Sequence, residues 1–183
     1  QTYDAVVDAQ GLVKSALVAN MAKGEVCGFA RDSAREPLAS LSYKQALSVA
    51  KTSHAIARQR RLFANRFGYE LTPGFSYGLE VENTIADNSV FFLHGTTWAS
   101  KHWPDQHWCD LARLCNEQGY KVKLSFMNEV EEHRAAKIAE AVDNVEVLPS
   151  GTLKDLTVHL AGSTGAVAVD TGLGHLAAAF NVP

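Results

Sequence analysis

The stretch Val169-Asp170-Thr171-Gly172-Leu173-Gly174-His175 connects an apolar run, Gly165 to Val169, to a second apolar segment, Leu176 to Phe180. The run is typical of a buried parallel strand, and the segment is typical of the start of a helix. At the carboxyl edge of an open α/β sheet, such a turn faces a crevice, and the free N–H groups of the helix attract anions. The stretch therefore predicts a pyrophosphate site, but the turn taken alone fits a simple strand-to-helix connection with an N-cap equally well.

The segments before this turn repeat the same alternation of strand and helix. Asn128 is a favourable N-cap, and Thr152 with Asp155 three residues on forms a capping signal. The alternation predicts a parallel sheet with helices on both faces, joined by right-handed crossovers. Strands are expected at Val90–Leu93, Val122–Phe126 and Val145–Leu148, and helices at Pro104–Gln118, from Asn128 to about Val142, and from Thr152 to Gly162.

The first part of the chain carries similar signals less regularly. Residues 71–88 lose the periodicity and include the turn residues Thr72-Pro73-Gly74, which indicates a linker. We therefore divide the chain into residues 1–70, a linker at 71–88, and residues 89–183. In the first division, strands are expected at Ala5–Ala9 and Val26–Phe29, and a first helix at about 12–22. A second helix is expected after Pro37, with Leu38, Leu41 and Leu47 on its apolar side. A third is expected from a cap at Ser53 to Phe67.

Composition narrows the class of protein. The 183 residues are 46% apolar and 20% charged with a formal net charge of −3, which fits an ordinary globular protein and indicates no bulk attraction to nucleic acid. Three cysteines without metal-site spacing suggest reduced thiols in a cytosolic protein. No apolar run approaches the roughly 18 residues of a membrane span, and no signal peptide is visible. Because the sequence starts in mid-pattern at Gln1 and stops at Pro183, where a further strand is expected, we expect it to be an internal piece of a longer protein.

If the sheet is parallel, its strand ends deliver their side chains to one edge. Hydroxyl groups and glycine backbone suit phosphate oxygens, a lysine is a point charge for them, and Glu131 could accept the hydroxyls of a ribose. Asp170 is expected to order the turn or bind a sugar hydroxyl. Each residue also has a structural interpretation, since Glu131 suits the positive end of a helix and Lys101 could be a plain surface lysine. The candidate set is Thr96, Thr97, Lys101, Glu131, Asp170, Thr171, Gly172 and His175.

Other kinds of site are disfavoured. His94, His102 and His107 fall on a strand end, a loop and a helix, so no metal site is expected. The sequence has neither a GxGxxG fingerprint nor a P-loop, which argues against a dinucleotide-binding fold and a kinase-like NTPase.

Longer motifs resemble those of the lipopolysaccharide heptosyltransferases. The resemblance implies a GT-B fold of two Rossmann-like domains with parallel sheets, of which this chain would hold the end of the acceptor domain (1–70) and most of the donor domain (89–183). It implies inverting transfer of L-glycero-D-manno-heptose from ADP-heptose to Kdo of lipid A, without metal or cofactor, by a cytoplasmic enzyme held peripherally on the bacterial inner membrane. The motifs are Leu93-His94-Gly95-Thr96-Thr97, Lys101-His102-Trp103-Pro104 and Val169–Leu176, and Tyr3–Ser15 with Ala34–Ser40 is closest to the type I members.

By motif match, the family's donor contacts fall on the eight candidate residues, with Lys101 stabilising the leaving phosphate, while Arg35 and the arginines near Arg60 would face the acceptor. The family's catalytic aspartate, in a Gly-Asp segment near the N-terminus, is absent, so this chain alone is expected to be inactive. Gly151 and Ser125-Phe126-Met127-Asn128 depart from the family pattern, which leaves the adenine contacts open. Two alternatives stay open: another GT-B nucleotide-sugar transferase or epimerase, such as heptosyltransferase II, and a non-catalytic nucleotide-binding module.

Overall fold

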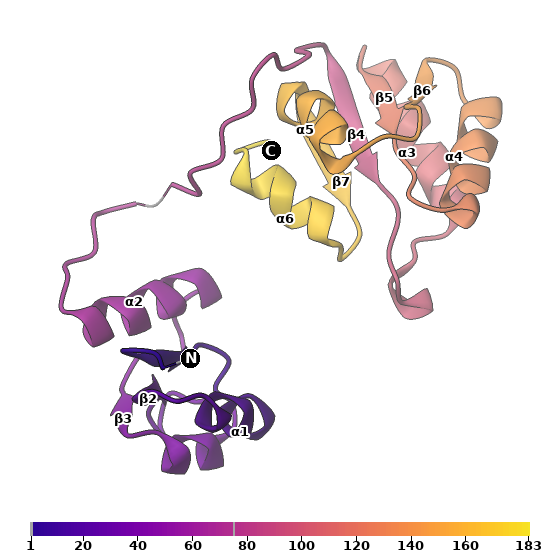
Figure 1. Ribbon diagram of the computed structural model, residues 1–183. Helices are drawn as coiled ribbons and strands as arrows, with labels where there is room; N and C mark the ends of the chain where they lie inside the picture. Colours follow the sequence, from indigo (N-terminus) through magenta and orange to yellow (C-terminus); the bar gives the residue numbers. More distant parts are fainter. Residues whose placement is uncertain (1, 75) are drawn as a thin grey trace. The chain divides into compact units, whose positions relative to one another are not determined.

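The computed structural model describes residues 2–74 and 76–183, and the chain forms two compact units that divide after residue 75 (Figure 1). Every strand pair in both units is parallel, so the predicted α/β class with parallel sheets is confirmed. Within the described residues, no helix is long and apolar enough to cross a membrane. The two units are described separately below.

The first unit is a three-stranded sheet in the order β1-β2-β3. One face packs Ala16, Val26 and Ala39 under α1 and η1, and the other packs Phe29 and Leu62 under α2, so helices cover both faces (Figure 1). Its elements are β1 (Val6–Asp8), α1 (Val13–Met21), β2 (Val26–Phe29), the 3-10 helix η1 (Pro37–Ser42), β3 (Gln45–Leu47) and α2 (Ala55–Phe67).

The segment after Pro37 differs from the prediction. We expected one helix carrying Leu38, Leu41 and Leu47, but the chain makes only a 3-10 helix, and Leu47 lies in the strand β3. The reason is tertiary: the Tyr43 ring is buried over Gly28, and its hydroxyl donates to Asp8 Oδ2 at 2.7 Å, which draws the chain into the sheet.

The second helix of this unit also starts one residue later than expected. Its N-cap is His54 rather than Ser53, and His54 Nδ1 accepts a hydrogen bond from Ile56 N. Its other end agrees with the prediction, because Gly68 closes the helix in the left-handed conformation (φ 70°) that favours glycine.

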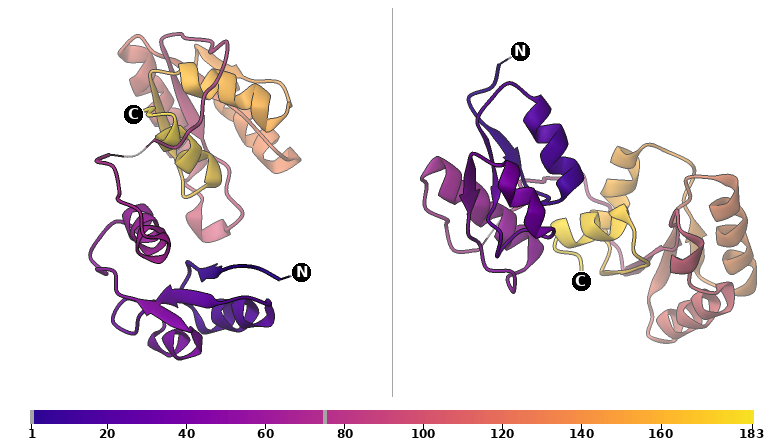
Figure 2. Two further views of the ribbon diagram at one scale, coloured as in Figure 1. Left: turned by 60° about the vertical axis from the view of Figure 1, so that its left-hand side comes forward. Right: turned by 90° about the horizontal axis from the view of Figure 1, so that it is seen from below.

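The second unit is a four-stranded parallel sheet in the order β6-β5-β4-β7. Figures 1 and 2 show α3 and α4 on one face and α5 and α6 on the other. Adjacent residues of β4 serve the two faces, since Phe92 packs with α3 and α4 whereas Phe91 packs with α5 and α6. The elements are β4 (Ser89–Leu93), η2 (Ala99–Lys101), α3 (Asp105–Glu117), β5 (Lys121–Leu124), α4 (Glu129–Ala141), β6 (Val145–Val147), α5 (Leu153–Gly162), β7 (Gly165–Ala168) and α6 (Gly172–Ala179).

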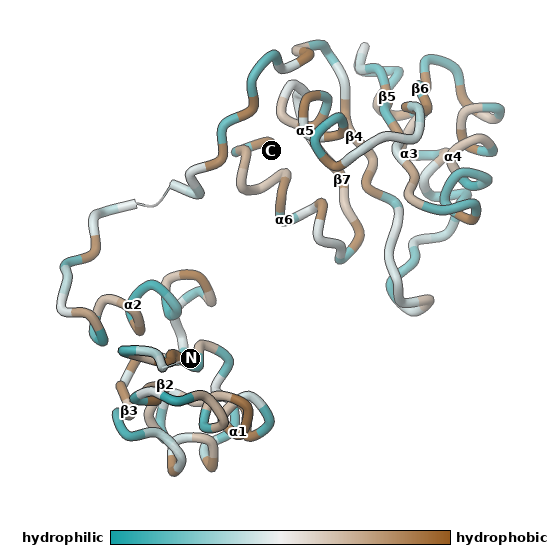
Figure 3. The backbone as a smooth tube through the Cα atoms, viewed as in Figure 1, coloured by the Kyte–Doolittle hydropathy of each residue, from teal (hydrophilic) through white to brown (hydrophobic). Residues whose placement is uncertain are grey.

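The predicted N-caps Asn128 and Thr152 are confirmed, whereas the last helix begins at Gly172 rather than at Leu176 as expected. Asn128 accepts from Glu131 N at 3.0 Å, and Thr152 and Asp155 form a reciprocal capping box. The tube of α4 in Figure 3 alternates between hydrophobic and hydrophilic stretches, as expected for a helix that buries one side, here Ala135 and Ile138. These caps fix where each helix begins relative to the strand before it.

The end of the stretch predicted as a linker packs on the second unit. Ile85 N donates to Val158 O at 3.1 Å, and Asp87 forms an ion pair with the buried Lys123 at 2.5 Å. A Cβ atom at Gly162 would overlap the backbone of Ile85, so glycine is needed where this segment crosses α5. Residues 85–88 are thus held in place rather than free.

Candidate functional site

The strand order of the second unit determines where a ligand can bind. From β4 the chain moves outward through β5 and β6 on one side, and then α5 returns it to β7 on the other side of β4. The switch point therefore lies between β4 and β7, and the crevice beyond their carboxyl ends is the usual ligand position in such sheets. The two ends are joined there by a hydrogen bond of 3.2 Å from Thr96 Oγ1 to Asp170 O.

A cavity of about 810 Å³ occupies this position. Besides the predicted residues, exposed Trp98 and Met127 line its wall. The structure thus brings together all the donor-site candidates selected from the strand ends: Thr96, Thr97, Lys101, Glu131, Asp170, Thr171, Gly172 and His175. Their individual roles stay predictions.

The N-terminus of α6 opens into the cavity. Asn128 and Thr152 cap their own helices, whereas the N-cap Thr171 makes no side-chain capping bond within the described part of the chain. A Cβ atom at Gly172 would meet no described atom within 4 Å. The first N–H groups of α6 and the Thr171 hydroxyl are thus available to an anion.

Lys101 and Asp170 form an ion pair across the cavity, with Lys101 Nζ 2.6 Å from Asp170 Oδ2. The hydrogen bond and charge of Lys101 lower the pKa of the Asp170 carboxyl. Both side chains stay partly exposed, so the pair adds little to stability but holds the ammonium group beside the α6 N-terminus. This fits the expectation that Asp170 orders the turn.

Glu131, predicted as a ribose ligand, also makes two contacts within the protein that fix the position of its carboxylate. Its Oε2 accepts from Met127 N at 2.8 Å, and its carboxylate lies so close to Gly95 that a Cβ atom there would overlap it. Glycine at position 95 therefore permits the contact between the β4 end and α4. Because a carboxylate has about four acceptor positions, Glu131 retains capacity for a ligand.

The sequence did not predict that His94 connects two strands at this site. It is fully buried, and its Nε2 lies 2.9 Å from Ser125 O, so it ties the ends of β4 and β5 together. Burial, with the nearby Arg134 charge, lowers the pKa of the imidazole, which is therefore neutral at pH 7. Only the position of His94 at the end of an apolar strand could have signalled this role.

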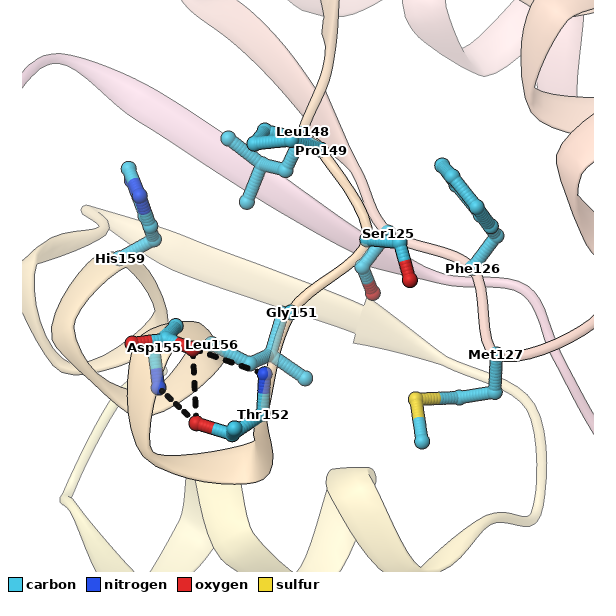
Figure 4. Close-up of a pocket in the computed structure, with 11 residues that line it drawn as sticks. Ser125, Phe126, Met127, Leu148, Pro149, Gly151, Thr152, Asp155, Leu156 and His159 are labelled. Atoms are coloured by element: carbon cyan, nitrogen blue, oxygen red, sulfur yellow. Dashed lines mark hydrogen bonds between the residues drawn. The ribbon is translucent and has the colours of Figure 1, made fainter.

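A smaller pocket of about 240 Å³ adjoins the cavity and shares Ser125 and Met127 with it (Figure 4). In Figure 4, Phe126 and Met127 lie on one side of it, and Leu148 and His159 lie on the other. The capping box of Thr152 and Asp155 forms its floor beside Gly151. Residue motifs did not predict this pocket, although its walls include the two segments that depart from the family pattern.

The predicted acceptor residues belong to the first unit. Arg35 is exposed on the first unit, and its role toward the acceptor stays a prediction. Arg58 donates to Ser33 O at 2.5 Å and stacks on Phe29, and Arg60 donates to Gly74 O at 2.8 Å. Those two arginines therefore have contacts within their own unit.

Asp8 is the carboxylate at the end of β1 and is the first candidate for a proton acceptor in this unit. It is buried, and its Oδ1 accepts from Gln10 N and Gly11 N. Its Oδ2 accepts from the hydroxyls of Ser15 and Tyr43. With both oxygens engaged by fixed donors, Asp8 orders the β1–α1 turn rather than serving as a free base.

The fold and the cavity define an α/β domain that presents a helix N-terminus, a lysine and hydroxyl groups to an anionic ligand at a sheet switch point. The sequence model of glycosyltransferase family 9 (heptosyltransferase) matches residues 1–183, so the chain belongs to this family.

Individual relatives agree. Lipopolysaccharide heptosyltransferase 1 of Pseudomonas aeruginosa is 47% identical over 188 residues, covering 99% of this chain and 53% of that protein. The structure of E. coli heptosyltransferase WaaC with ADP is 44% identical with a TM-score of 0.89, and that of WaaC with ADP-2-deoxy-2-fluoro heptose is 41% identical with a TM-score of 0.84. The matches cover all of this chain and 61% and 60% of those structures, so the chain spans between half and two thirds of the relatives' length.

Proposed function

We propose that this chain is the donor-binding part, with a portion of the acceptor part, of an inverting heptosyltransferase. It binds ADP-heptose in the cavity between β4 and β7, and the enzyme transfers L-glycero-D-manno-heptose to Kdo of lipid A. The observation that carries the proposal is the meeting of all the predicted donor residues around one cavity. The similarity to WaaC, whose structures were solved with ADP and with an ADP-heptose analogue, supports the choice of nucleotide.

In this proposal the Kdo hydroxyl attacks the anomeric carbon from the face opposite ADP. The new C–O bond forms as the bond to the β-phosphate oxygen breaks, and ADP leaves with the electron pair. Lys101, Thr96, Thr97 and the α6 N-terminus stabilise the charge that develops on the phosphate, which is where electrostatic catalysis is most effective. Glu131 binds the ribose, and Asp170 and His175 position the sugar.

The base that accepts the Kdo proton is proposed to be an aspartate in the part of the relatives that this chain does not span. The engagement of both Asp8 oxygens supports this, since Asp8 is poorly placed to take a proton. Arg35 is proposed to face the anionic acceptor. Because that acceptor is anchored in a membrane, the enzyme is proposed to work as a peripheral protein on the cytoplasmic face of the inner membrane.

Nucleotide preference tests the proposed donor. Isothermal titration of this chain is expected to show binding of ADP and weaker binding of UDP and GDP, because the similar WaaC structures were solved with ADP and an ADP-heptose analogue, and the adjoining pocket has room for a base. A preference for UDP or GDP would favour the alternative of a different nucleotide-sugar transferase. Heat signals from none of the three would contradict a nucleotide site altogether.

Glu131→Ala tests the proposed ribose contact. It is expected to weaken ADP binding by about 1–3 kcal/mol, the scale of hydrogen bonds to a charged group. Glu132→Ala is a matched control, because Glu132 lies in the same first turn of α4 but is exposed and outside the cavity lining. Equal ADP dissociation constants for the two variants would remove Glu131 from the site.

A further inference from the structure

The loop between β4 and α3 carries much of the proposed donor site. Thr96, Thr97 and Lys101 all lie on residues 94–104, a segment whose only regular structure is the three-residue η2. So short an element cannot by itself hold three ligand-binding side chains in register. Something outside the loop must fix its position.

Arg134, on α4, contacts both ends of this loop. Its Nη1 donates to His94 O at 3.2 Å where the loop begins, and its Nε donates to Asp105 Oδ1 at 2.9 Å where α3 starts. Its Nη1 also lies 3.1 Å from His102 Nδ1, which must be the acceptor because a guanidinium only donates. The Arg134 side chain is 13% exposed, so these bonds are largely shielded from water.

The same helix holds the loop at a further point. Glu131, one turn before Arg134, lies against Gly95 and accepts from Met127 N at the other wall of the cavity. Glu131 and Arg134 lie three residues apart on one face of α4. Glu131 contacts the start of the loop, and Arg134 contacts both of its ends. Helix α4 acts as the rigid element against which the loop is set.

An ion pair with Asp105 would be the simplest explanation of Arg134, but it does not account for the geometry. Asp105 is already paired through its Oδ2 with Lys137 at 3.2 Å, so its charge is compensated without Arg134. The Nη1 group of Arg134 is directed to His94 and His102 while Nε bonds to Asp105, and a lysine could not reproduce this forked arrangement. Arg134 is not among the residues that line the cavity, so any effect on a ligand passes through the loop.

We propose that Arg134 is a positioning residue of the donor site, a clamp that joins both ends of loop 94–104 to α4 and thereby sets Thr96, Thr97 and Lys101 for the pyrophosphate. The effect of Arg134 on ligand binding rests on the proposed function of the cavity. Its effect on the order of the loop does not, so loop order and ADP affinity can be measured separately.

The first measurement needs no ligand. Hydrogen exchange at the Lys101 and His102 amides, which bond to Trp98 O and Ala99 O, is expected to be roughly tenfold faster in Arg134→Ala, because the loop opens locally. Arg113→Ala is the matched control, since Arg113 also pairs with an aspartate and contacts a backbone carbonyl but lies outside the loop and the cavity lining. Unchanged exchange in Arg134→Ala would overturn the clamp whatever the ligand does.

The second measurement is the ADP dissociation constant by calorimetry. Arg134→Ala is expected to weaken binding roughly tenfold, and by roughly threefold or less when Lys101 is already alanine, because residues that act through one another are not additive. Equal losses in both backgrounds would show a merely structural role and overturn the positioning of Lys101. If the native chain binds no ADP while the loop amides still depend on Arg134, the proposed function fails and the clamp stands.

Arg134→Lys keeps the experiment decisive if the alanine variant does not fold. A lysine retains the charge beside Asp105 but has only one nitrogen that can donate. Arg134 uses two, Nε toward Asp105 and Nη1 toward His94 O. Its thermal stability is expected to stay near that of the native chain while the loop amides exchange faster. Native exchange rates in Arg134→Lys would mean that charge alone suffices, which contradicts the clamp.

Discussion

Replacing Asp87 with alanine is expected to lower the free energy of unfolding of the second unit by about 3 kcal/mol at pH 7, the lower part of the range for breaking a buried ion pair. The Lys123 side chain is 1% exposed in the middle of β5, and its ammonium group lies 2.5 Å from Asp87 Oδ2. Removing Asp87 leaves this charge buried, whereas the Asp87 side chain itself keeps 32% exposure, which moderates the loss. Urea unfolding followed by tryptophan fluorescence measures it, because Trp98, Trp103 and Trp108 all lie in the second unit.

A surface ion pair between β5 and the neighbouring strand β6 provides the control. Lys121 and Glu146 are 2.7 Å apart with both side chains 39% exposed, so Glu146→Ala should cost less than about 1 kcal/mol. Adding Lys123→Met to Asp87→Ala should recover much of the stability, since an apolar side chain suits the buried position. Similar losses for Asp87→Ala and Glu146→Ala would show that the burial of Lys123 is of little consequence.

The stabilisation by Asp87 should also depend on pH. Partial burial opposes ionisation of Asp87, but the bonds from Lys123 and Ser89 outweigh it and lower the pKa of the carboxyl. A carboxyl whose folded-state pKa is depressed stabilises the fold above its unfolded pKa and loses that contribution as the pH falls through the folded pKa. The stability difference between the native chain and Asp87→Ala should therefore be full at pH 7 and shrink in acid.

The second unit was largely predictable because local and tertiary signals agree there. Strands β4 and β7 are apolar runs, and Asn128 and Thr152 cap helices as their side chains suggest. In the first unit the signals conflict. Leu47 fits a helical spacing, yet it joins β3 because Tyr43 is anchored on Asp8, a contact between residues 35 positions apart that no local pattern contains.

The same distinction applies to the site. Residues that follow parallel strands could be predicted because the topology alone brings Lys101 and Asp170 to one edge. His94 and Arg134 could not, since their roles depend on a bond to Ser125 O and on a guanidinium shared between His94 O and Asp105. From the sequence alone, an arginine on a helix is expected to be solvated, because its bonding partners are known only once the fold is known.

Lys101→Ala, introduced into the intact enzyme that contains this chain, is expected to lower donor-saturated turnover roughly tenfold or more, part of what a charge-stabilising donor supplies. The physical reason is position: Asp170 holds the Lys101 ammonium 2.6 Å away, next to the uncapped N-terminus of α6. A lysine held there before the donor binds needs little reorganisation when charge develops on the leaving phosphate. Turnover is measured as heptose transfer to a Kdo-lipid A acceptor at saturating ADP-heptose.

Lys121→Ala is the control for this variant, because Lys121 has the same 39% side-chain exposure and a similar ion pair but lies at the opposite end of the sheet's strands. Its turnover should be unchanged. Asp170→Asn tests the other member of the pair: it keeps the Lys101 cation but weakens its ion pair and the proposed contact of Asp170 with the sugar, and because the cation remains, its turnover should fall less than that of Lys101→Ala. If Lys101→Ala raised KM but left turnover intact, Lys101 would bind the donor equally well in the ground state and in the transition state. The stabilisation of the leaving phosphate would then be assigned to Thr96, Thr97 and the α6 N-terminus.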